Sequence, residues 1–201
     1  IRYHLQSGDL GIYLRTLGTS YVVSKVVDDQ VEAYRFDLDL IGGLVPEVLP
    51  SLPTQAYNNY YQAHCPDGVL EVPSYQEVVF REIYPAIDLR WTATGEAIKY
   101  EFIVHPGGNP DDIRFQLSAP ELVTHNAQGE LVFNLPTGLV KEQAPYTYHK
   151  GGPGGDPQAI PTSFQLANGQ LSYLIGDYDP SQDLIIDPMV MYRSTYSGCS
   201  T

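Results

Sequence analysis

Basic residues are scarce in this chain of 201 residues. Eleven Lys and Arg stand against 24 Asp and Glu, which gives a net charge of −13 and a pI near 4.5. Nucleic acids and anionic lipids are bound through basic patches, so the charge argues against both classes of partner. Charged residues make up only 17% of the chain and aromatic residues 11%, which is the opposite of a disordered composition.

Long apolar runs are missing as well. No stretch of 18 apolar residues occurs, so the sequence predicts no membrane span. A signal peptide is not recognisable either. Because the chain begins with Ile1 and its first five residues already resemble a strand, we expect the natural start to lie upstream.

Cysteine is limited to Cys65 and Cys199, whose spacing fits no zinc motif. A disulfide between them would close a long loop and would contribute at most about 5 kcal/mol on the chain-entropy model. Two free thiols are the alternative, and the sequence favours neither.

Helical periodicity is nearly absent, and short alternating strands take its place. Hairpin turns are indicated at Asp28-Asp29, at Thr94-Gly95, over residues 126–129 and at Asn168-Gly169. Alternation predicts which side chains point inward from two of the strands: Glu32, Tyr34, Phe36, Leu38 and Leu40 from the first, and Tyr100, Phe102 and Val104 from the second.

The density of strands and turns predicts an all-β fold with little helix: an antiparallel β-sandwich, formed either as one unit or as two packed sub-lobes. Residues 42–53 contain three prolines and are predicted to form a surface connector rather than a central strand. The predicted organisation is an N-terminal β sub-lobe (1–53), a main β-sandwich (54–193) and the start of a following module (194–201).

Tyrosine is the most unusual residue type, with 16 Tyr against six Phe and one Trp. Half-buried strand positions suit tyrosine, because the ring packs while the hydroxyl stays hydrated. Exposed rings could instead stack on sugars or form a protein interface. The candidates for such a surface are Tyr57, Tyr60, Tyr61, Trp91, Tyr146 and Tyr148.

Metal-ligand and catalytic motifs are not found. The five histidines are dispersed and are each interpreted as a strand or turn residue: His4, His64, His105, His125 and His149. No GxSxG motif marks a nucleophilic serine. The acidic turn with Asp177, Asp179 and Asp183 is the best calcium candidate, because it offers carboxylates at loop spacing. The alternative is a solvated turn whose aspartates cap backbone amides.

Asp88 and Glu101 are carboxylates on neighbouring predicted strands, with Arg81, Arg90 and Lys99 nearby in sequence. A pair of carboxylates could in principle cleave a glycosidic bond. Ion pairs across the sheet are the other interpretation and need no substrate.

Four blocks of the chain carry a family resemblance: IRYHLQSGDLGIYL, YQEVVFREIYPAIDLRW, IKYEFIVHPGGNPDDIRFQLSAPE and LIIDPMVMYRSTYSGCS. Their order and spacing resemble the bacterial domain of unknown function that precedes SBBP-type β-propeller repeats in large secreted proteins, common in Bacteroidota. The similarity is closest after Tyr57 and looser up to Pro53. Cys199 stands where that family usually has Gly.

The resemblance implies an exported, multi-domain protein at the cell surface or outside the cell, often with a type nine secretion sorting domain. It offers no catalytic residue to carry over.

The expected function is therefore a non-catalytic structural or adhesive module, an adhesin or part of a fibre or filament, with no catalytic or cofactor-binding residues. Expected partners are neighbouring domains of the same chain, further copies in a homo-oligomer, or a glycan. The alternative is a carbohydrate-binding module or a glycan-active enzyme that uses exposed Tyr and Trp with paired carboxylates.

Overall fold

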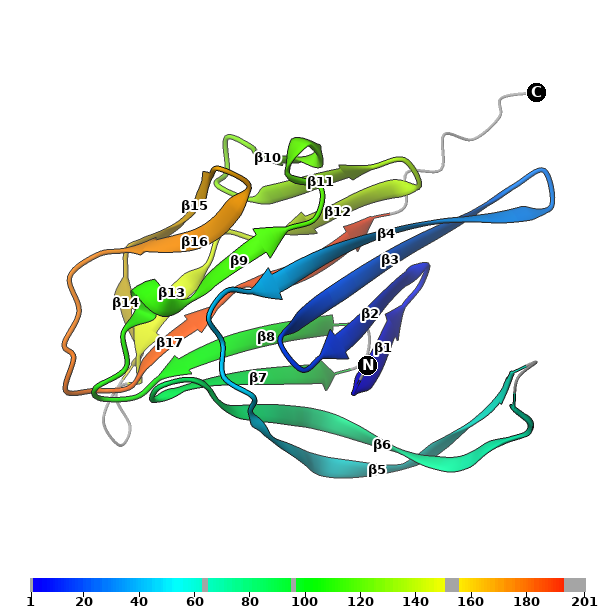
Figure 1. Ribbon diagram of the computed structural model, residues 1–201. Coiled ribbons are helices and arrows are strands. Elements are labelled where there is room, and N and C mark those ends of the chain that lie inside the picture. Colours follow the sequence, from blue (N-terminus) through cyan, green and yellow to red (C-terminus); the bar gives the residue numbers. More distant parts are fainter. Residues whose placement is uncertain (1, 63–64, 95–96, 151–155, 194–201) are drawn as a thin grey trace.

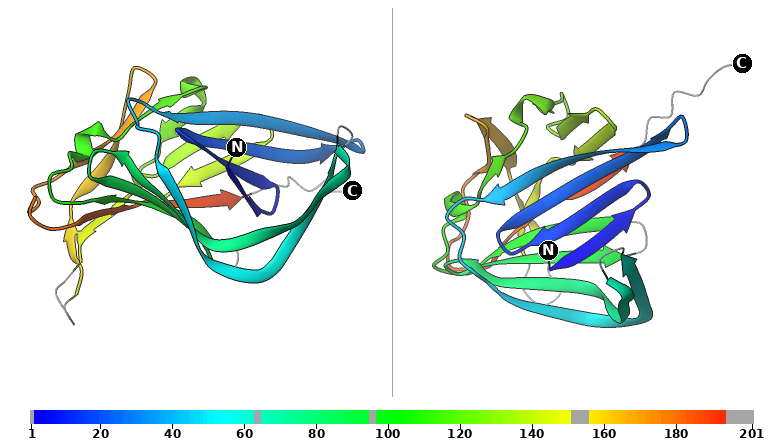
Figure 2. Two further views of the ribbon diagram at one scale, coloured as in Figure 1. Left: turned by 60° about the horizontal axis from the view of Figure 1, so that its bottom comes forward. Right: turned by 45° about the vertical axis from the view of Figure 1, so that its right-hand side comes forward.

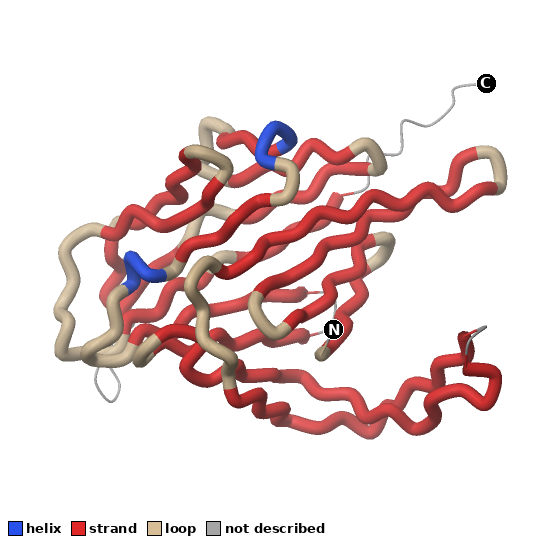
Figure 3. Tube along the Cα trace, in the orientation of Figure 1, coloured by secondary structure: helices blue, strands red, loops and turns tan. Residues whose placement is uncertain are grey.

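The computed structural model describes residues 2–62, 65–94, 97–150 and 156–193. Most of them lie in strands, which form two large antiparallel sheets (Figures 1 and 3), and this confirms the predicted all-β sandwich. In the described ranges the only helices are two 3-10 turns, η1 (Pro110–Asp112) and η2 (Pro120–Leu122). No helix in that part of the chain has the length and apolar character to span a membrane.

The first sheet has seven strands and combines the start of the chain with later segments. In spatial order its strands are β1 (Tyr3–Ser7), β2 (Leu10–Arg15), β3 (Gly18–Val27), β4 (Gln30–Leu40), β9 (Arg114–Leu117), β16 (Gln170–Ile175) and β15 (Thr162–Ala167). Strand β1 pairs only with β2, so one of its sides is a free sheet edge.

The second sheet has 11 strands. One path through it runs β10 (Val123–His125), β11 (Leu131–Leu135), β12 (Gly138–Glu142), β18 (Met189–Arg193), β8 (Ala97–Val104), β17 (Leu184–Asp187), β13 (Tyr146–His149) and β14 (Gln158–Ile160). A branch continues from β8 to β7 (Ile87–Thr94), β6 (Cys65–Tyr84) and β5 (Glu47–Gln62).

Aromatic side chains fill the core between the sheets. Phe36 of β4 stacks on Phe133 of β11 at 4.7 Å between ring centroids. Phe102 of β8 meets Phe115 of β9 edge to face at 5.9 Å and Tyr173 of β16 at 6.3 Å. Each pair joins one sheet to the other, so these rings hold the sandwich together.

The alternation predicted for two strands is confirmed. Phe36, Leu38 and Leu40 are buried, whereas Glu32 is exposed because β4 extends beyond the body at that end. Tyr100, Phe102 and Val104 of β8 are all buried.

The short hairpin turns form at the positions that their turn residues predict. Asp28 and Asp29 both have positive φ (49° and 61°) between the paired residues Val27 and Gln30. Asn168 (φ 53°) makes a similar turn between β15 and β16 together with the following glycine. The loop over residues 126–129 joins β10 to β11 as predicted. At Thr94-Gly95 the β7–β8 hairpin is formed, but Gly95 lies outside the described residues.

The predicted connector is wrong over residues 47–53, because β5 begins at Glu47 and includes Pro50 and Pro53. Strand β5 pairs only with β6, so its other side needs no backbone N–H donors and tolerates proline. The hairpin of β5 and β6, called the arm below, extends past the body on the side of β1 (Figures 1 and 2).

The boundary predicted after residue 53 falls inside β5, and the strands before it share a sheet with β9, β15 and β16. The assignment of sub-lobes to residues 1–53 and 54–193 stays a prediction. The module predicted over residues 194–201 lies outside the described residues.

Candidate functional site

A groove of about 470 Å³ lies between the free edge of β1 and the arm. Its lining comes from five segments that are distant in sequence: Arg2, Tyr3, His4 and Leu5 at the start of the chain, Leu14 of β2, Asn58 and Tyr60 of β5, residues 72–78 of β6, and Trp91 and Ala93 of β7. A hollow of this size is in the range of small-molecule and glycan sites.

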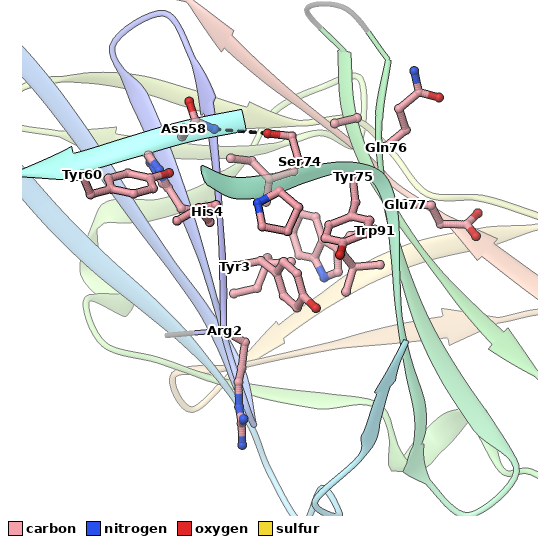
Figure 4. Close-up of a pocket in the computed structure, with 16 residues that line it drawn as sticks. Arg2, Tyr3, His4, Asn58, Tyr60, Ser74, Tyr75, Gln76, Glu77 and Trp91 are labelled. Carbon is pink, nitrogen blue, oxygen red and sulfur yellow. Dashed lines mark hydrogen bonds between the residues drawn. The ribbon is translucent and has the colours of Figure 1, made fainter. Parts of the chain in front are cut away.

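Strand alternation places the groove's apolar side chains. Tyr3 and Leu5 are half-buried on one face of β1, while His4 and Gln6 are exposed on the other. Across the groove, Tyr75 meets Tyr3 edge to face at 6.5 Å between centroids. Figure 4 shows the rings of Tyr3, Tyr75 and Trp91 close together in the middle of the site.

The polar groups of the groove are mostly neutral. Asn58 donates a hydrogen bond from its Nδ2 to the Ser74 hydroxyl at 3.2 Å, drawn as a dashed line in Figure 4. Glu77 is the one acidic residue of the lining, and its carboxylate accepts a 2.6 Å hydrogen bond from the hydroxyl of Ser51. A second carboxylate does not face it from the lining, so the groove lacks the pair that glycoside hydrolysis uses.

The six aromatic residues singled out from the sequence do not form one platform. Tyr60 and Trp91 line the groove, but Trp91 is only 3% exposed and lies at its floor. Tyr57 and Tyr61 are on the arm, with exposed fractions of 61% and 68%. Tyr146 and Tyr148 belong to β13, where their rings stack at 5.2 Å. Tyr3 and Tyr75 were missed, because only the tertiary fold brings β1 and β6 together.

Asp88 and Glu101 do not form a pair of catalytic carboxylates. Glu101 lies directly opposite Arg90 on the neighbouring strand and binds both Arg90 and Lys99, the latter at 3.0 Å. Burial raises the pKa of Glu101, but these two cations lower it by more, so the carboxylate stays ionised. Lys99 also bridges to Asp187 at 3.0 Å. Of the two interpretations of Glu101, these contacts fit an ion pair across neighbouring strands.

Asp88 takes part in a different cluster, centred on His105. The imidazole Nδ1 lies 2.9 Å from Asp183 and Nε2 lies 3.4 Å from Asp88, whose other oxygen accepts the backbone N–H of Glu82. Burial lowers the pKa of His105, but the two carboxylates raise it by more. The adjoining open hollow of about 600 Å³ has no Ser, Thr, Cys or Lys among its lining residues, so that lining supplies no side-chain nucleophile to this His–Asp pair.

The acidic turn is a capped turn rather than a calcium loop. Asp179 accepts hydrogen bonds from the backbone and hydroxyl of Ser181 and from the side chain of Gln182, which lower its pKa to about 2. Asp183 is directed to His105. Across the described ranges no three His, Cys, Asp or Glu side chains form a group able to hold a metal ion.

The remaining histidines have structural contacts. His149 is buried: its Nε2 accepts the backbone N–H of Asp179 at 3.0 Å and its Nδ1 donates to the carbonyl of Asp183 at 2.9 Å. His4 stacks on Tyr13 and His125 on Phe164. His64 and Cys199 lie outside the described residues, so the pairing of the two cysteines stays open.

Glu142 is a buried titratable group that sequence reasoning missed. It is 2% exposed, and it accepts a hydrogen bond from the hydroxyl of Tyr100, which lies 3.3 Å from the hydroxyl of Tyr173. Burial raises the pKa of Glu142 to about 7, although the bond from Tyr100 lowers it. The alternation of side chains along a strand could have indicated this burial, because Glu142 lies two residues after the buried Val140 and therefore on the same face of β12.

Comparison with known proteins gives one family match. A family model described as a domain of unknown function (DUF7948) matches residues 1–189. No match is found among the curated proteins or among the solved structures.

Proposed function

We propose that this chain, which belongs to the family described as a domain of unknown function (DUF7948), is a non-catalytic structural or adhesive module of a large bacterial protein that is secreted or displayed at the cell surface. The observation that carries the proposal is the groove between β1 and the arm, whose aromatic and neutral polar side chains suit binding.

The chemistry of the lining supports binding. Aromatic rings bury a large area at little cost in conformational entropy, and amide and hydroxyl groups orient a ligand without reacting with it. Glu77 is hydrogen-bonded to Ser51 and is the one carboxylate of the lining, so the groove lacks the carboxylate pair that glycoside hydrolysis uses.

The sequence resemblance supports the proposal that this chain is a module of a large secreted protein. The blocks at residues 75–91 and 98–121 are similar to the domain that precedes SBBP-type β-propeller repeats in large secreted proteins. In such a protein this chain would be one module of an extracellular fibre or filament, with other domains of the same polypeptide as its neighbours.

A second candidate is carbohydrate binding by the same groove. Tyr60 is partly exposed at its wall, Tyr3 and Tyr75 line its middle, and Asn58 and Ser74 lie beside them. Tyrosine rings with neutral hydrogen-bonding groups suit a neutral sugar, because each ring packs on the apolar face of a pyranose while the amide and hydroxyl groups bond its hydroxyls.

The single tryptophan makes a direct test possible. Trp91 is the one Trp of the chain and lies at the floor of the groove, so its fluorescence reports occupancy. The protein is titrated with cello-, chito- and manno-oligosaccharides, and its adhesion to polysaccharide-coated and protein-coated surfaces is measured. The variant Tyr60→Ala should weaken any binding at the groove, whereas Tyr146→Ala, an exposed tyrosine on β13, should not.

The outcomes separate the two candidates. A saturable change in Trp91 emission with an oligosaccharide supports the carbohydrate-binding function. Adhesion to the protein-coated surface that Tyr60→Ala weakens, with no response to sugars, supports the adhesive module. Absence of both would contradict a binding role for the groove.

A further inference from the structure

The distal part of the arm exposes large apolar side chains on both strands. This distal arm comprises residues 52–61 and 67–72, and its exposed members are Leu52, Tyr57, Tyr60, Tyr61, Val69 and Leu70. Figures 1 and 2 show the two strands running together beyond the body, with no further strand beside them at the far end. Exposed apolar surface gathered on one projecting element is typical of an interaction site.

A two-stranded ribbon of this kind is weakly stable by itself. The pairing of β5 with β6 is interrupted by register shifts after Pro53, Asn58 and Tyr60, which weakens the ladder further. A contact that covers the ribbon would therefore stabilise it as well as bury its side chains.

The distribution of charge along the chain indicates which kind of partner surface would cover the distal arm. The whole chain carries −13, so the bodies of two copies repel each other. Residues 48–66 contain no Asp, Glu, Lys or Arg. The other strand of the distal arm adds Asp67 and Glu71 and no basic residue. From residue 48 onward β5 itself offers no acidic side chain to a basic partner, and two acidic copies approach each other at the lowest electrostatic cost through this uncharged strand.

The backbone argues against pairing through the strand edge. Pro50 and Pro53 lack N–H donors, and the register shifts make the outer side of β5 irregular, so a partner strand cannot extend the sheet along it. The outer side of β6 pairs with β7 only from Glu77 onward, and before that point Pro73 interrupts it. The contact is therefore one of side chains, with Tyr57 and Tyr61 as the most exposed rings.

We propose that the distal arm is a homodimer interface, in which two copies pack arm against arm about a twofold axis and bury Tyr57 and Tyr61. The two rings at its centre, Tyr57 and Tyr61, do not line the groove proposed above as a binding site, whereas the neighbouring Asn58 and Tyr60 do, and the contact needs no ligand. It would give an otherwise self-repelling module one defined site of association.

The test is sedimentation velocity of the 201-residue protein over a range of concentrations, with Cys65→Ser and Cys199→Ser introduced so that thiol oxidation cannot link copies. The expected result is a reversible monomer–dimer equilibrium. In that background Tyr57→Ser with Tyr61→Ser should raise the dimer Kd at least about tenfold, because exposed tyrosines at an interface centre contribute strongly. Tyr146→Ser is the matched control and should leave the Kd unchanged.

Salt gives an independent readout. Raising the ionic strength from about 0.01 M to about 1 M shortens the Debye length from about 30 Å to about 3 Å, so repulsion between the bodies is screened and dimerisation should strengthen. A monomer at every concentration, open-ended oligomers, a dimer that survives the double substitution, or a dimer that salt dissociates would each overturn the proposal. None of these results depends on Trp91 emission, so the groove is tested separately.

Discussion

At the scale of single residues, Glu142 makes the stability of the protein depend on pH. Its carboxyl is buried between the sheets, and its pKa is raised from 4.5 to about 7 by that burial. The native state therefore holds the proton more tightly than the unfolded chain does. Stability falls as the pH rises from 4.5 to about 7, and this group causes no further loss above that range.

Replacement of Glu142 by Gln should remove this loss. The amide oxygen can still accept the hydrogen bond from Tyr100, but it carries no charge at any pH. We expect little difference from the natural protein near pH 4.5 and a gain of up to roughly 3 kcal/mol at pH 8, since one pKa unit corresponds to about 1.4 kcal/mol. Urea unfolding at the two pH values measures the difference.

An exposed carboxylate provides the control. Glu121→Gln in η2 should change the free energy of unfolding by less than about 0.5 kcal/mol at either pH. Equal effects of Glu142→Gln at both pH values would show that the pKa of this carboxyl does not differ between the native and the unfolded state.

At the scale of elements, the entry into β3 depends on Gly18. Its φ is +148°, and a Cβ built on it would lie 2.4 Å from the carbonyl oxygen of Leu38, on the neighbouring strand β4. That oxygen is held in the strand ladder and cannot easily move. The approach of the two strands at this point therefore requires glycine.

Gly18→Ala should accordingly destabilise the protein by about 3 kcal/mol, through backbone strain and the clash with β4. Gly8→Ala is the comparison, because Gly8 also has positive φ (56°) but has no atom within 4 Å of its Cβ position. It should lose only about 1 kcal/mol. Thermal or urea unfolding distinguishes the two, and equal losses would mean that Gly18 has room for a side chain.

The sequence predicted correctly those hairpin turns whose geometry depends only on the residues of the turn itself. Asp28-Asp29 and Asn168 occupy left-handed turn positions that their short polar side chains tolerate, and both hairpins form where expected. The first part of the arm, residues 47–53, was predicted as a connector because prolines such as Pro50 and Pro53 are unfavourable in a central strand. The sequence does not show that β5 is an edge strand, where proline is tolerated.

At the scale of the whole molecule, the groove could not be foreseen. Tyr3 and Tyr75 are far apart in sequence and meet only because β1 ends one sheet beside the branch of the other that carries β6. The same holds for His105 and Asp183, whose contact joins β8 to the acidic turn. The same contact bears on the calcium interpretation of that turn: Asp183 faces His105 and Asp179 caps Ser181 and Gln182, and the carboxylates do not form a metal-binding group in the part of the chain that the structure describes.

The net charge of −13 also acts on the molecule as a whole. Repulsion among the surplus carboxylates opposes the compact state, and salt screens it. We expect the melting temperature at pH 8 to rise as the ionic strength is raised from about 0.01 M to about 1 M with a weakly interacting salt such as NaCl. A melting temperature that falls would indicate that attractive ion pairs such as Arg90–Glu101 outweigh the repulsion.

The most direct test of a non-catalytic assembly module is native mass spectrometry of the protein purified from its own host. The account predicts a polypeptide longer than these 201 residues, present in complexes with more than one copy. A free-standing chain of 22.3 kDa that stays monomeric would contradict it.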